Sequence, residues 1–125
     1  MDRSDLGALF AGLRATVTIA DENGRILFLN DRAVAHYADR GGRELIGTHL
    51  HDCHNPTSQK KIRQMYARYR AGDLSPTRYH RQQGDSTART IVVLPIIVEG
   101  EFRGVAELMW SERPEFVFET EAVQA

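Results

Sequence analysis

The hydrophobic and polar positions at the start of the chain predict an amphipathic helix followed by a β-hairpin. Four apolar side chains share the i, i+3, i+4, i+7 spacing of one helical stripe, which indicates a helix over residues 1–13. These side chains are Leu6, Leu9, Phe10 and Leu13. Residues 15–19 alternate small or apolar side chains with hydroxyl side chains, as a strand with one buried face does. Asn23-Gly24 predicts a tight turn, and residues 26–29 return as a strand that is apolar on both faces and is expected to be covered on both sides.

The middle of the chain has helical periodicity. Asn30 is expected to cap a short helix that a glycine pair ends. The longest helix is expected to contain Pro56 in its first turn, to be capped by Asn55 or Thr57, and to be closed by Gly72. Its apolar stripe consists of Ile62, Met65, Tyr66 and Tyr69. Five basic side chains lie largely off that stripe and are interpreted as a solvated face, with a binding face as the alternative: Lys60, Lys61, Arg63, Arg68 and Arg70.

The last third of the chain predicts three more strands. They cover residues 77–81, 90–98 and 102–110, with turns at residues 83–86 and 99–101. Pro95 has no N–H for a strand ladder, so we expect it at a sheet edge or a bulge. Two strands, a block of helices and three antiparallel strands together predict an α+β domain with helices on one face of a five-stranded sheet. The expected organisation is a helix over residues 1–13, a domain over residues 14–111 and a loose acidic tail over residues 112–125.

Composition narrows the function classes. A length of 125 residues with 42% hydrophobic residues fits one globular domain. The 16 basic and 17 acidic residues nearly cancel, so no nucleic-acid or membrane partner is expected. The N-terminus lacks a signal-peptide pattern, and one cysteine excludes an internal disulfide. We therefore expect a cytoplasmic domain.

Candidate chemistry is concentrated in residues 48–58, which hold three of the five histidines and the single cysteine. Nitrogen and sulfur ligands suited to a transition metal come from His49, His51, Cys53 and His54. A closed site with all four is sterically awkward, and His51 and His54 remain the candidate metal ligands. The alternative is a loop whose histidines bond to the backbone, with Cys53 as a small buried hydrophobe.

An enzyme is not expected. The adjacent Cys53 and His54 could supply a nucleophile and a base, but neighbouring residues rarely point at one another. No third group that would orient the base is evident in the sequence. We therefore predict no catalytic residues.

Several runs of residues resemble a PAS domain, in which an Asp-x-x-Gly turn joins two strands and an asparagine caps the first helix. The opening match is Ile19-Ala20-Asp21-Glu22-Asn23-Gly24-Arg25-Ile26-Leu27-Phe28-Leu29-Asn30. Glu44-Leu45-Ile46-Gly47 is similar to the Leu-Ile-Gly that follows in that family, and Val98-Glu99-Gly100-Glu101-Phe102-Arg103-Gly104-Val105 is similar to its final hairpin. The resemblance spans about residues 6–110 and implies the PAS fold.

A narrower similarity lies at the start of the long helix. Cys53-His54-Asn55-Pro56-Thr57-Ser58 resembles the Cys-His-Pro-Pro-x-Ser run of a PAS subfamily often found beside hemerythrin-like domains in bacterial regulators. Asn55 replaces the first proline of that run, and His49 and His51 are not part of it.

The family resemblance implies a sensory and signalling module, some of whose relatives hold haem, flavin, a covalent chromophore or a metabolite between the sheet and the long helix. Flavin is not expected, because the Asn-Cys-Arg-Phe-Leu-type motif is absent around Cys53. A thioester-linked chromophore is not expected, because no tyrosine–glutamate pair is evident in the preceding helices. Haem relatives place their histidine within the long helix, where this chain has Lys61 or Ile62. The cofactor is therefore unknown, with haem through His54 or Cys53 and a metal ion left open.

The predicted pocket joins the start and inner stripe of the long helix to the last two strands. Its residues are Cys53, His54, Ile62, Met65, Tyr66, Ile91, Val93, Leu108 and Trp110. Cys53 and His54 are expected to border it, whereas His49 and His51 turn outward.

The expected function is a sensory module that binds a small ligand, forms a homodimer and controls an unknown downstream signalling protein. The first helix must bury its stripe against its own domain or against a second copy. Relatives imply the second, with Leu6, Leu9, Phe10 and Leu13 in the interface. The alternative is a protein-interaction module whose core is filled by its own side chains.

Overall fold

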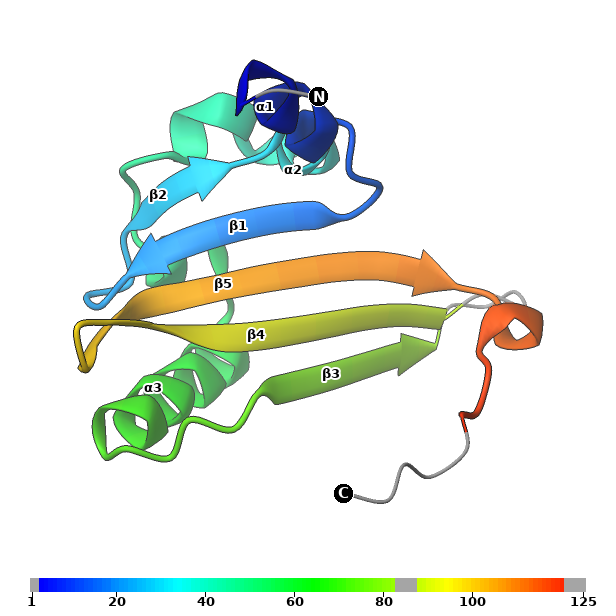
Figure 1. Ribbon diagram of the computed structural model, residues 1–125. Coiled ribbons are helices and arrows are strands. Elements are labelled where there is room, and N and C mark those ends of the chain that lie inside the picture. The colour runs from blue at the N-terminus through cyan, green and yellow to red at the C-terminus, as the bar shows by residue number, and fades with distance from the viewer. Residues whose placement is uncertain (1–2, 83–87, 121–125) are drawn as a thin grey trace.

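The computed structural model describes residues 3–82 and 88–120, which form an antiparallel sheet with α2 and α3 on one face (Figure 1). The helices are α1 (Arg3–Ala11), α2 (Asp31–His36) and α3 (Pro56–Arg70), and the strands are β1 (Thr16–Asp21), β2 (Ile26–Leu29), β3 (Thr77–Gln82), β4 (Ala88–Val98) and β5 (Glu101–Glu112). Four 3-10 turns complete the described elements: η1 (Ala38–Arg40), η2 (Gly42–Leu45), η3 (Leu50–Cys53) and η4 (Pro114–Phe116). The predicted α+β architecture is confirmed, while the turn expected at residues 83–86 lies outside the described residues.

The five strands run in the order β2-β1-β5-β4-β3, so the first and last strands of the chain are neighbours in the middle. One row of paired residues crosses the whole sheet, because Leu29, Thr18, Glu107, Val93 and Thr77 are successive partners from β2 to β3. Side chains opposite one another in a sheet share a face. This row therefore defines the face that α2 and α3 cover.

Helix α3 closes that face with the predicted stripe. Met65, Tyr66 and Tyr69 are buried, and Ile62 is partly buried against the same cluster. The ring of Phe102 lies between the two tyrosines, with centroids 5.7 Å from Tyr66 and 6.0 Å from Tyr69. The helix phase predicted from the spacing of apolar residues is correct.

Pro95 shows why a proline is tolerated in an internal strand. The pairing of β4 with β3 ends at Val93 and Thr77, so β4 is locally an edge strand at Pro95. The ladder with β5 continues through Pro95 and Val105 and shifts register between Ile96 and Ile97. A missing N–H is compatible with both features, and the expected edge or bulge is observed.

The expectation that β2 is covered on both sides is wrong. Strand β2 is an edge strand, and Leu27 and Phe28 are 57% and 36% exposed, so only Ile26 and Leu29 are covered. An apolar run on both faces does not reveal that α1 covers the outer face only in part, with the Phe10 ring 6.2 Å from that of Phe28. Strand β5 continues to Glu112, two residues beyond the predicted strand, and Pro114–Phe116 form η4; the loose tail expected over residues 112–125 stays a prediction.

Asn30 fixes the junction between the hairpin and α2. Its side-chain oxygen accepts from the N–H groups of Ala33 (2.9 Å) and Val17 (3.0 Å), and its side-chain nitrogen donates to the carbonyl of Ala15 (2.9 Å). The predicted cap is confirmed, and the same buried side chain also bonds to the chain at both sides of Thr16.

Replacing Asn30 with Ala should lower the free energy of unfolding by about 2–4 kcal/mol, because it removes a cap and leaves buried backbone groups without partners. The matched control is Asn55→Ala, which removes an exposed cap that accepts from the Ser58 N–H at 2.9 Å. That change should lower the stability by only about 1 kcal/mol. Urea denaturation measures both values, and equal losses would contradict the role assigned to Asn30.

Candidate ligand pocket

A cavity of about 420 Å³ lies between α3 and the covered face of the sheet. This volume falls within the range of about 300–1,000 Å³ that is typical of ligand pockets. Its walls are largely apolar and come from the five strands, η1, η2, η3 and α3. The apolar lining residues are Ala20, Ile26, Leu29, Leu45, Leu50, Ile62, Met65, Ile91, Val93 and Val105.

Polar side chains enter the cavity from several elements. Glu107 and Thr18 lie on the sheet, on neighbouring strands and directly opposite one another. Other polar and charged lining residues are Tyr37, Arg40, His54, Ser58, Lys61 and Tyr79. The cavity thus combines an apolar body with a few convergent polar groups, the usual composition of a small-molecule site.

Glu107 is an acidic residue inside the domain. Desolvation raises the pKa of its carboxyl group above the ordinary value, while nearby His54 and a hydrogen bond from Tyr37 act in the opposite direction. The Tyr37 hydroxyl donates to its Oε1 at 3.5 Å, the upper limit for such a contact. Burial also raises the pKa values of Tyr37 and Tyr79, and the Glu107 charge adds to both shifts. Tyr37 and Glu107 thus form a tyrosine–glutamate contact, but its glutamate lies on β5 and not in the helices that precede α3.

The entry to α3 is built by hydrogen bonds within residues 48–59. The Nδ1–H of His54 donates to the carbonyl of Leu50 at 2.6 Å, because a carbonyl can only accept. The side-chain nitrogen of Gln59 donates to the carbonyls of His51 and His54, both at 2.8 Å. Asn55 caps the helix. These bonds place Cys53 and His54 at the cavity wall, where the sequence argument put them; their binding of a ligand remains a prediction.

His49 and His51 lie on a second, smaller groove with Asn23, Arg63 and Arg70. The Nε2–H of His49 donates to the Asn23 carbonyl at 2.6 Å, and its Nδ1 accepts from the His51 N–H at 3.1 Å. Both nitrogens of His49 are therefore occupied. Desolvation, with help from His49 and Arg63, lowers the pKa of His51 below its ordinary value.

The two candidate metal ligands do not share a hollow, because His54 lines the large cavity and His51 lines the second groove. Among the described residues, no group of three or more His, Cys, Asp or Glu side chains is placed to hold a metal ion. His51 lies within the 3-10 turn η3 and His54 follows its last residue. The sequence argument treated this stretch as extended and did not predict the turn.

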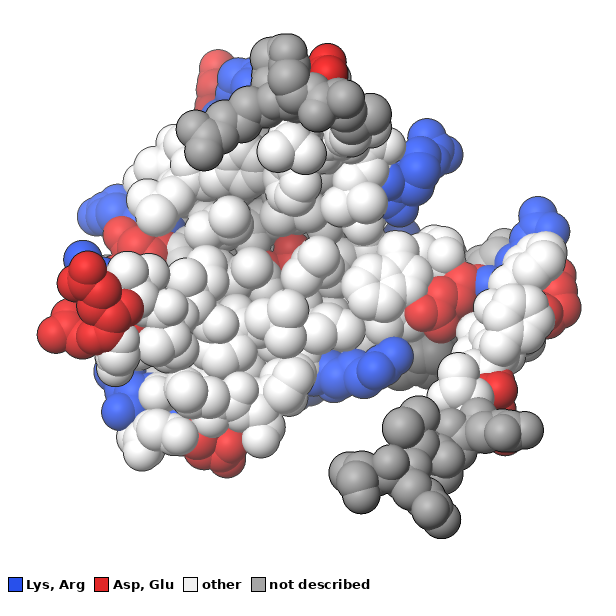
Figure 2. Space-filling view, viewed as in Figure 1, with Lys and Arg blue, Asp and Glu red and all other residues white. Residues whose placement is uncertain are grey.

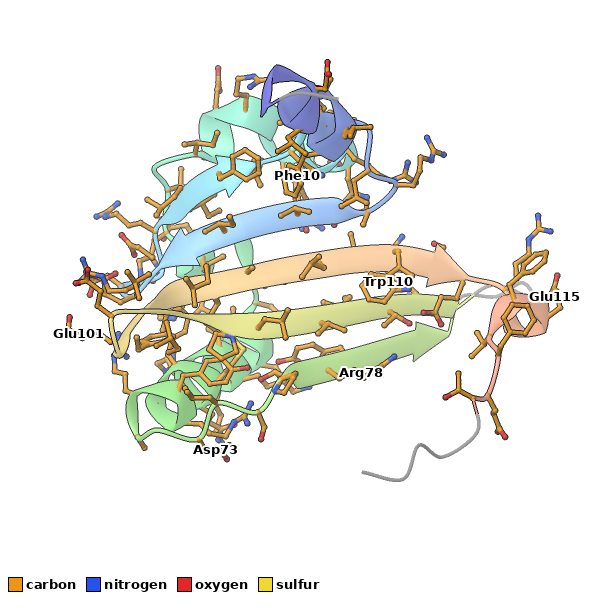
Figure 3. The ribbon with its side chains drawn as sticks, in the orientation of Figure 1. Phe10, Asp73, Arg78, Glu101, Trp110 and Glu115 are labelled. Atoms are coloured by element: carbon orange, nitrogen blue, oxygen red, sulfur yellow. The ribbon has the colours of Figure 1, made fainter. Side chains whose placement is uncertain are left out.

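The predicted pocket residues on the sheet need one correction. Ile91 and Val93 line the cavity, but Leu108 and Trp110 do not. They alternate with Glu107 and Met109 along β5 and therefore project from the opposite face, on which Figure 3 shows Trp110. Tyr66 also lies off the cavity: it packs against Phe102, and its hydroxyl donates to the Asp21 carbonyl at 2.9 Å. Of the α3 residues, Ile62 and Met65 line the cavity as predicted.

The residues that sequence reasoning missed are Thr18, Tyr37 and Glu107. A signal for Glu107 is present, since it is the single charged residue between Gly104 and Trp110 in an otherwise apolar strand. Counting alternate residues from Val105 would have placed Glu107 on the inner face.

Part of the basic set on α3 contacts the protein itself. Arg68 pairs with Asp73 and lies 4.9 Å from the centroid of the Tyr69 ring, and Arg70 donates to the Glu22 carbonyl and lies 5.4 Å from the Tyr66 ring. Lys61 lines the cavity. The interpretation as a purely solvated face is thus too simple, because long basic side chains also cover apolar surface.

Comparisons with known proteins agree with this architecture. The family model described as PAS fold matches residues 10–111, and the chain belongs to this family. No curated protein matches the sequence.

Solved structures show the same fold at low sequence identity. A C-terminal domain from Streptococcus mutans has a TM-score of 0.76 and 17% identity, covering 93% of this chain and 89% of that one. A sensory box sensor histidine kinase from Vibrio cholerae has a TM-score of 0.60 and 16% identity, covering 88% and 91%. The Aer2 receptor from Vibrio cholerae, a dual PAS-haem oxygen sensor, has a TM-score of 0.57 and 17% identity, covering 78% and 93%. At these identities, the likeness shows the fold.

Within the described part of the chain, no helix has the length and apolar character needed to cross a membrane.

Replacing Glu107 with Gln should stabilise the protein at neutral and alkaline pH. Because the pKa of Glu107 is raised in the folded state, its favourable contribution to the free energy of unfolding is complete below the ordinary carboxyl pKa. That contribution is lost as the pH rises through the raised pKa. A neutral amide of similar shape avoids this loss, so the pH dependence of the free energy of unfolding should flatten. Urea denaturation, repeated from a pH below the ordinary carboxyl pKa into the alkaline range, measures the effect.

The control for that measurement is Glu101→Gln at the exposed start of β5, where the carboxylate lies 3.8 Å from Arg103. Because both partners are exposed, this change should alter stability by less than about 1 kcal/mol at any pH. A Glu107→Gln protein that is less stable than wild type in alkali would refute the burial argument.

Proposed function

We propose that this chain is a sensory PAS module that responds to a small molecule bound between α3 and the sheet. The observation that carries the proposal is the cavity of about 420 Å³ with largely apolar walls and a partly buried carboxyl group. A protein-interaction module with a core filled by its own side chains would not need such a volume. The cavity therefore favours ligand sensing over that alternative.

The comparisons supply a second line of support. A solved structure with this fold belongs to a sensor histidine kinase, and another belongs to a haem oxygen sensor. Cys53 and His54, which carry the resemblance to a subfamily of bacterial regulators, both line the cavity. Because Cys53 and His54 adjoin the Asn55 cap, the start of α3 is the proposed route from a bound ligand to a downstream signalling protein.

We include homodimerisation through α1 in this proposal. Its four apolar side chains are substantially exposed, with fractions of 59% for Leu6, 54% for Leu9, 47% for Phe10 and 44% for Leu13. The domain itself covers them only in part, and the ring of Phe10 lies 6.2 Å from that of Phe28 (Figure 3). The adjoining face of the molecule carries few charged residues in its middle (Figure 2). Exposed apolar patches of this kind mark interaction sites.

Filling the cavity should abolish ligand binding. Ile62→Trp adds volume from a partly buried position on α3 that lines the cavity. The control is Ile46→Trp, at a residue 40% exposed and away from the cavity. In a fragment screen by ligand-observed NMR, hits on the wild type should be lost in the first variant and kept in the second. The proposal fails if no fragment binds, or if Ile62→Trp retains the hits with its fold intact.

The absorption spectrum of the purified protein tests the haem alternative. A Soret band that disappears in His54→Ala would show haem ligation through His54. The proposed metabolite-type ligand requires a spectrum without that band.

Replacing Leu9 with Glu should convert the dimer to a monomer, because it places a charge in the centre of the α1 stripe. Size exclusion with light scattering measures the mass. The control is Leu74→Glu, at a similarly exposed leucine (43%) that follows α3, which should leave the dimer intact. A wild-type monomer, or a Leu9→Glu dimer, would contradict the interface.

A further inference from the structure

The floor of the cavity is the part of the sheet that carries Thr18 and Glu107, and the polar groups of these two residues lack adequate partners. Among the described residues, Glu107 forms no ion pair, and its hydrogen bond from Tyr37 is 3.5 Å long. Thr18, its direct neighbour across the β1–β5 ladder, is 7% exposed, and its hydroxyl has no hydrogen-bond partner within the described part of the chain. Buried polar atoms in native proteins nearly always have partners. The Thr18 hydroxyl is such an atom, and the partly buried Glu107 carboxyl group beside it has, within the residues described, only the long contact from Tyr37, so together they point to a partner on the ligand.

The chemistry of this floor selects a hydrogen-bond donor. A carboxylate accepts hydrogen bonds, and a hydroxyl can accept or donate, so an N–H group can bond to both. A ligand carboxylate would instead meet a like charge at Glu107. A purely apolar ligand would remove the remaining solvent from both groups and leave them unpaired, which is unfavourable. An amine or another N–H group therefore suits this end of the cavity best.

The rim of the cavity, formed by the exposed residues Arg40 and Lys61, favours an anionic ligand group. Arg40 on η1 and Lys61 on α3 both line the cavity and belong to the exposed residues. Neither forms an ion pair with an acid among the residues described. Guanidinium and ammonium groups form strong hydrogen bonds with carboxylates and phosphates. The rim thus favours an anionic group, whereas the floor favours a donor.

We infer that the cavity binds a small molecule with an apolar body, an amine at the end that contacts Glu107 and Thr18, and a carboxylate at the end that contacts Arg40 and Lys61. This inference rests on the proposed ligand-sensing function and adds the chemical class and the orientation of the ligand.

Three matched probes test the two ends separately. 4-(2-Aminoethyl)benzoate carries both groups, 4-ethylbenzoate lacks the amine, and phenethylamine lacks the carboxylate. By titration calorimetry in mildly alkaline solution, the first probe should bind about tenfold more tightly than either of the others, the effect of one charge-assisted hydrogen bond. Equal affinity of 4-ethylbenzoate and the first probe would overturn the inference.

Variants of the floor assign the amine to its site. Glu107→Gln should weaken both amine probes by about tenfold to a hundredfold while leaving 4-ethylbenzoate unchanged. Thr18→Val, which keeps the shape and removes the hydroxyl, should weaken the amine probes by a smaller factor. Glu101→Gln, on the same strand but away from the cavity, should change nothing. An equal loss of all three probes in Glu107→Gln would indicate a structural effect and overturn the assignment.

Variants of the rim assign the carboxylate. Lys61→Gln should weaken the two benzoates about tenfold and spare phenethylamine. Its control is Lys60→Gln, at the preceding residue of α3, which does not line the cavity. The same loss in both lysine variants would overturn the rim assignment, because it would reflect net charge alone.

The failure of this inference differs from the failure of the proposed function. If fragments bind to the wild type and are lost in Ile62→Trp, but the amine confers no advantage, the class of ligand is wrong and the sensory pocket stands. If neither the fragments nor the probes bind, both conclusions are wrong.

Discussion

The antiparallel pairing of β1 with β5 holds the two halves of the chain together. It runs from Thr16 and Met109 to Asp21 and Gly104, and it places the first strand beside the last one at the centre of the sheet. The approach is close at Gly104, where a Cβ atom would lie 2.1 Å from the carbonyl oxygen of Ala20 and where φ is 153°. A side chain there would push the strands apart. The same register sets Thr18 against Glu107, so the character of the cavity floor depends on this pairing.

Stability and the proposed ligand binding make opposing demands on that floor. An apolar residue at position 107 would fill the core without desolvating a carboxyl group, whereas Glu107 carries an unfavourable, raised pKa. Ionisable groups with strongly shifted pKa values occur preferentially at functional sites. The contacts around α3 offset this loss: the Tyr69 hydroxyl bonds to Thr77 and to the Val93 carbonyl, and Tyr66 bonds to the Asp21 carbonyl. The helix is thereby attached to the sheet at one end, while the other end leaves the cavity open.

Much of the fold was predictable because its signals are local. The spacing of Met65, Tyr66 and Tyr69 determines which side of α3 is buried, and the Asn30 side chain caps the next helix within four residues. The Asp21-to-Gly24 turn and the hairpin at Glu99 and Gly100 depend on backbone conformations that their own residues favour. Leu50 packs against the core and thereby holds its loop close to the sheet. The position of Cys53 and His54 at the cavity wall was predictable for this reason.

The sequence by itself determined the main helices, the strands, the PAS family and the cap of α3, because each follows from periodicity, capping or turn chemistry over a few residues. Only the tertiary structure decided that β2 is an edge strand, that Leu108 and Trp110 face away from the cavity, and that His51 and His54 lie on different hollows. It also brought Thr18, Tyr37 and Glu107 together from three distant elements. The reason is physical: strand register and the volume left between a helix and a sheet depend on contacts between residues far apart in the chain, which no local pattern encodes.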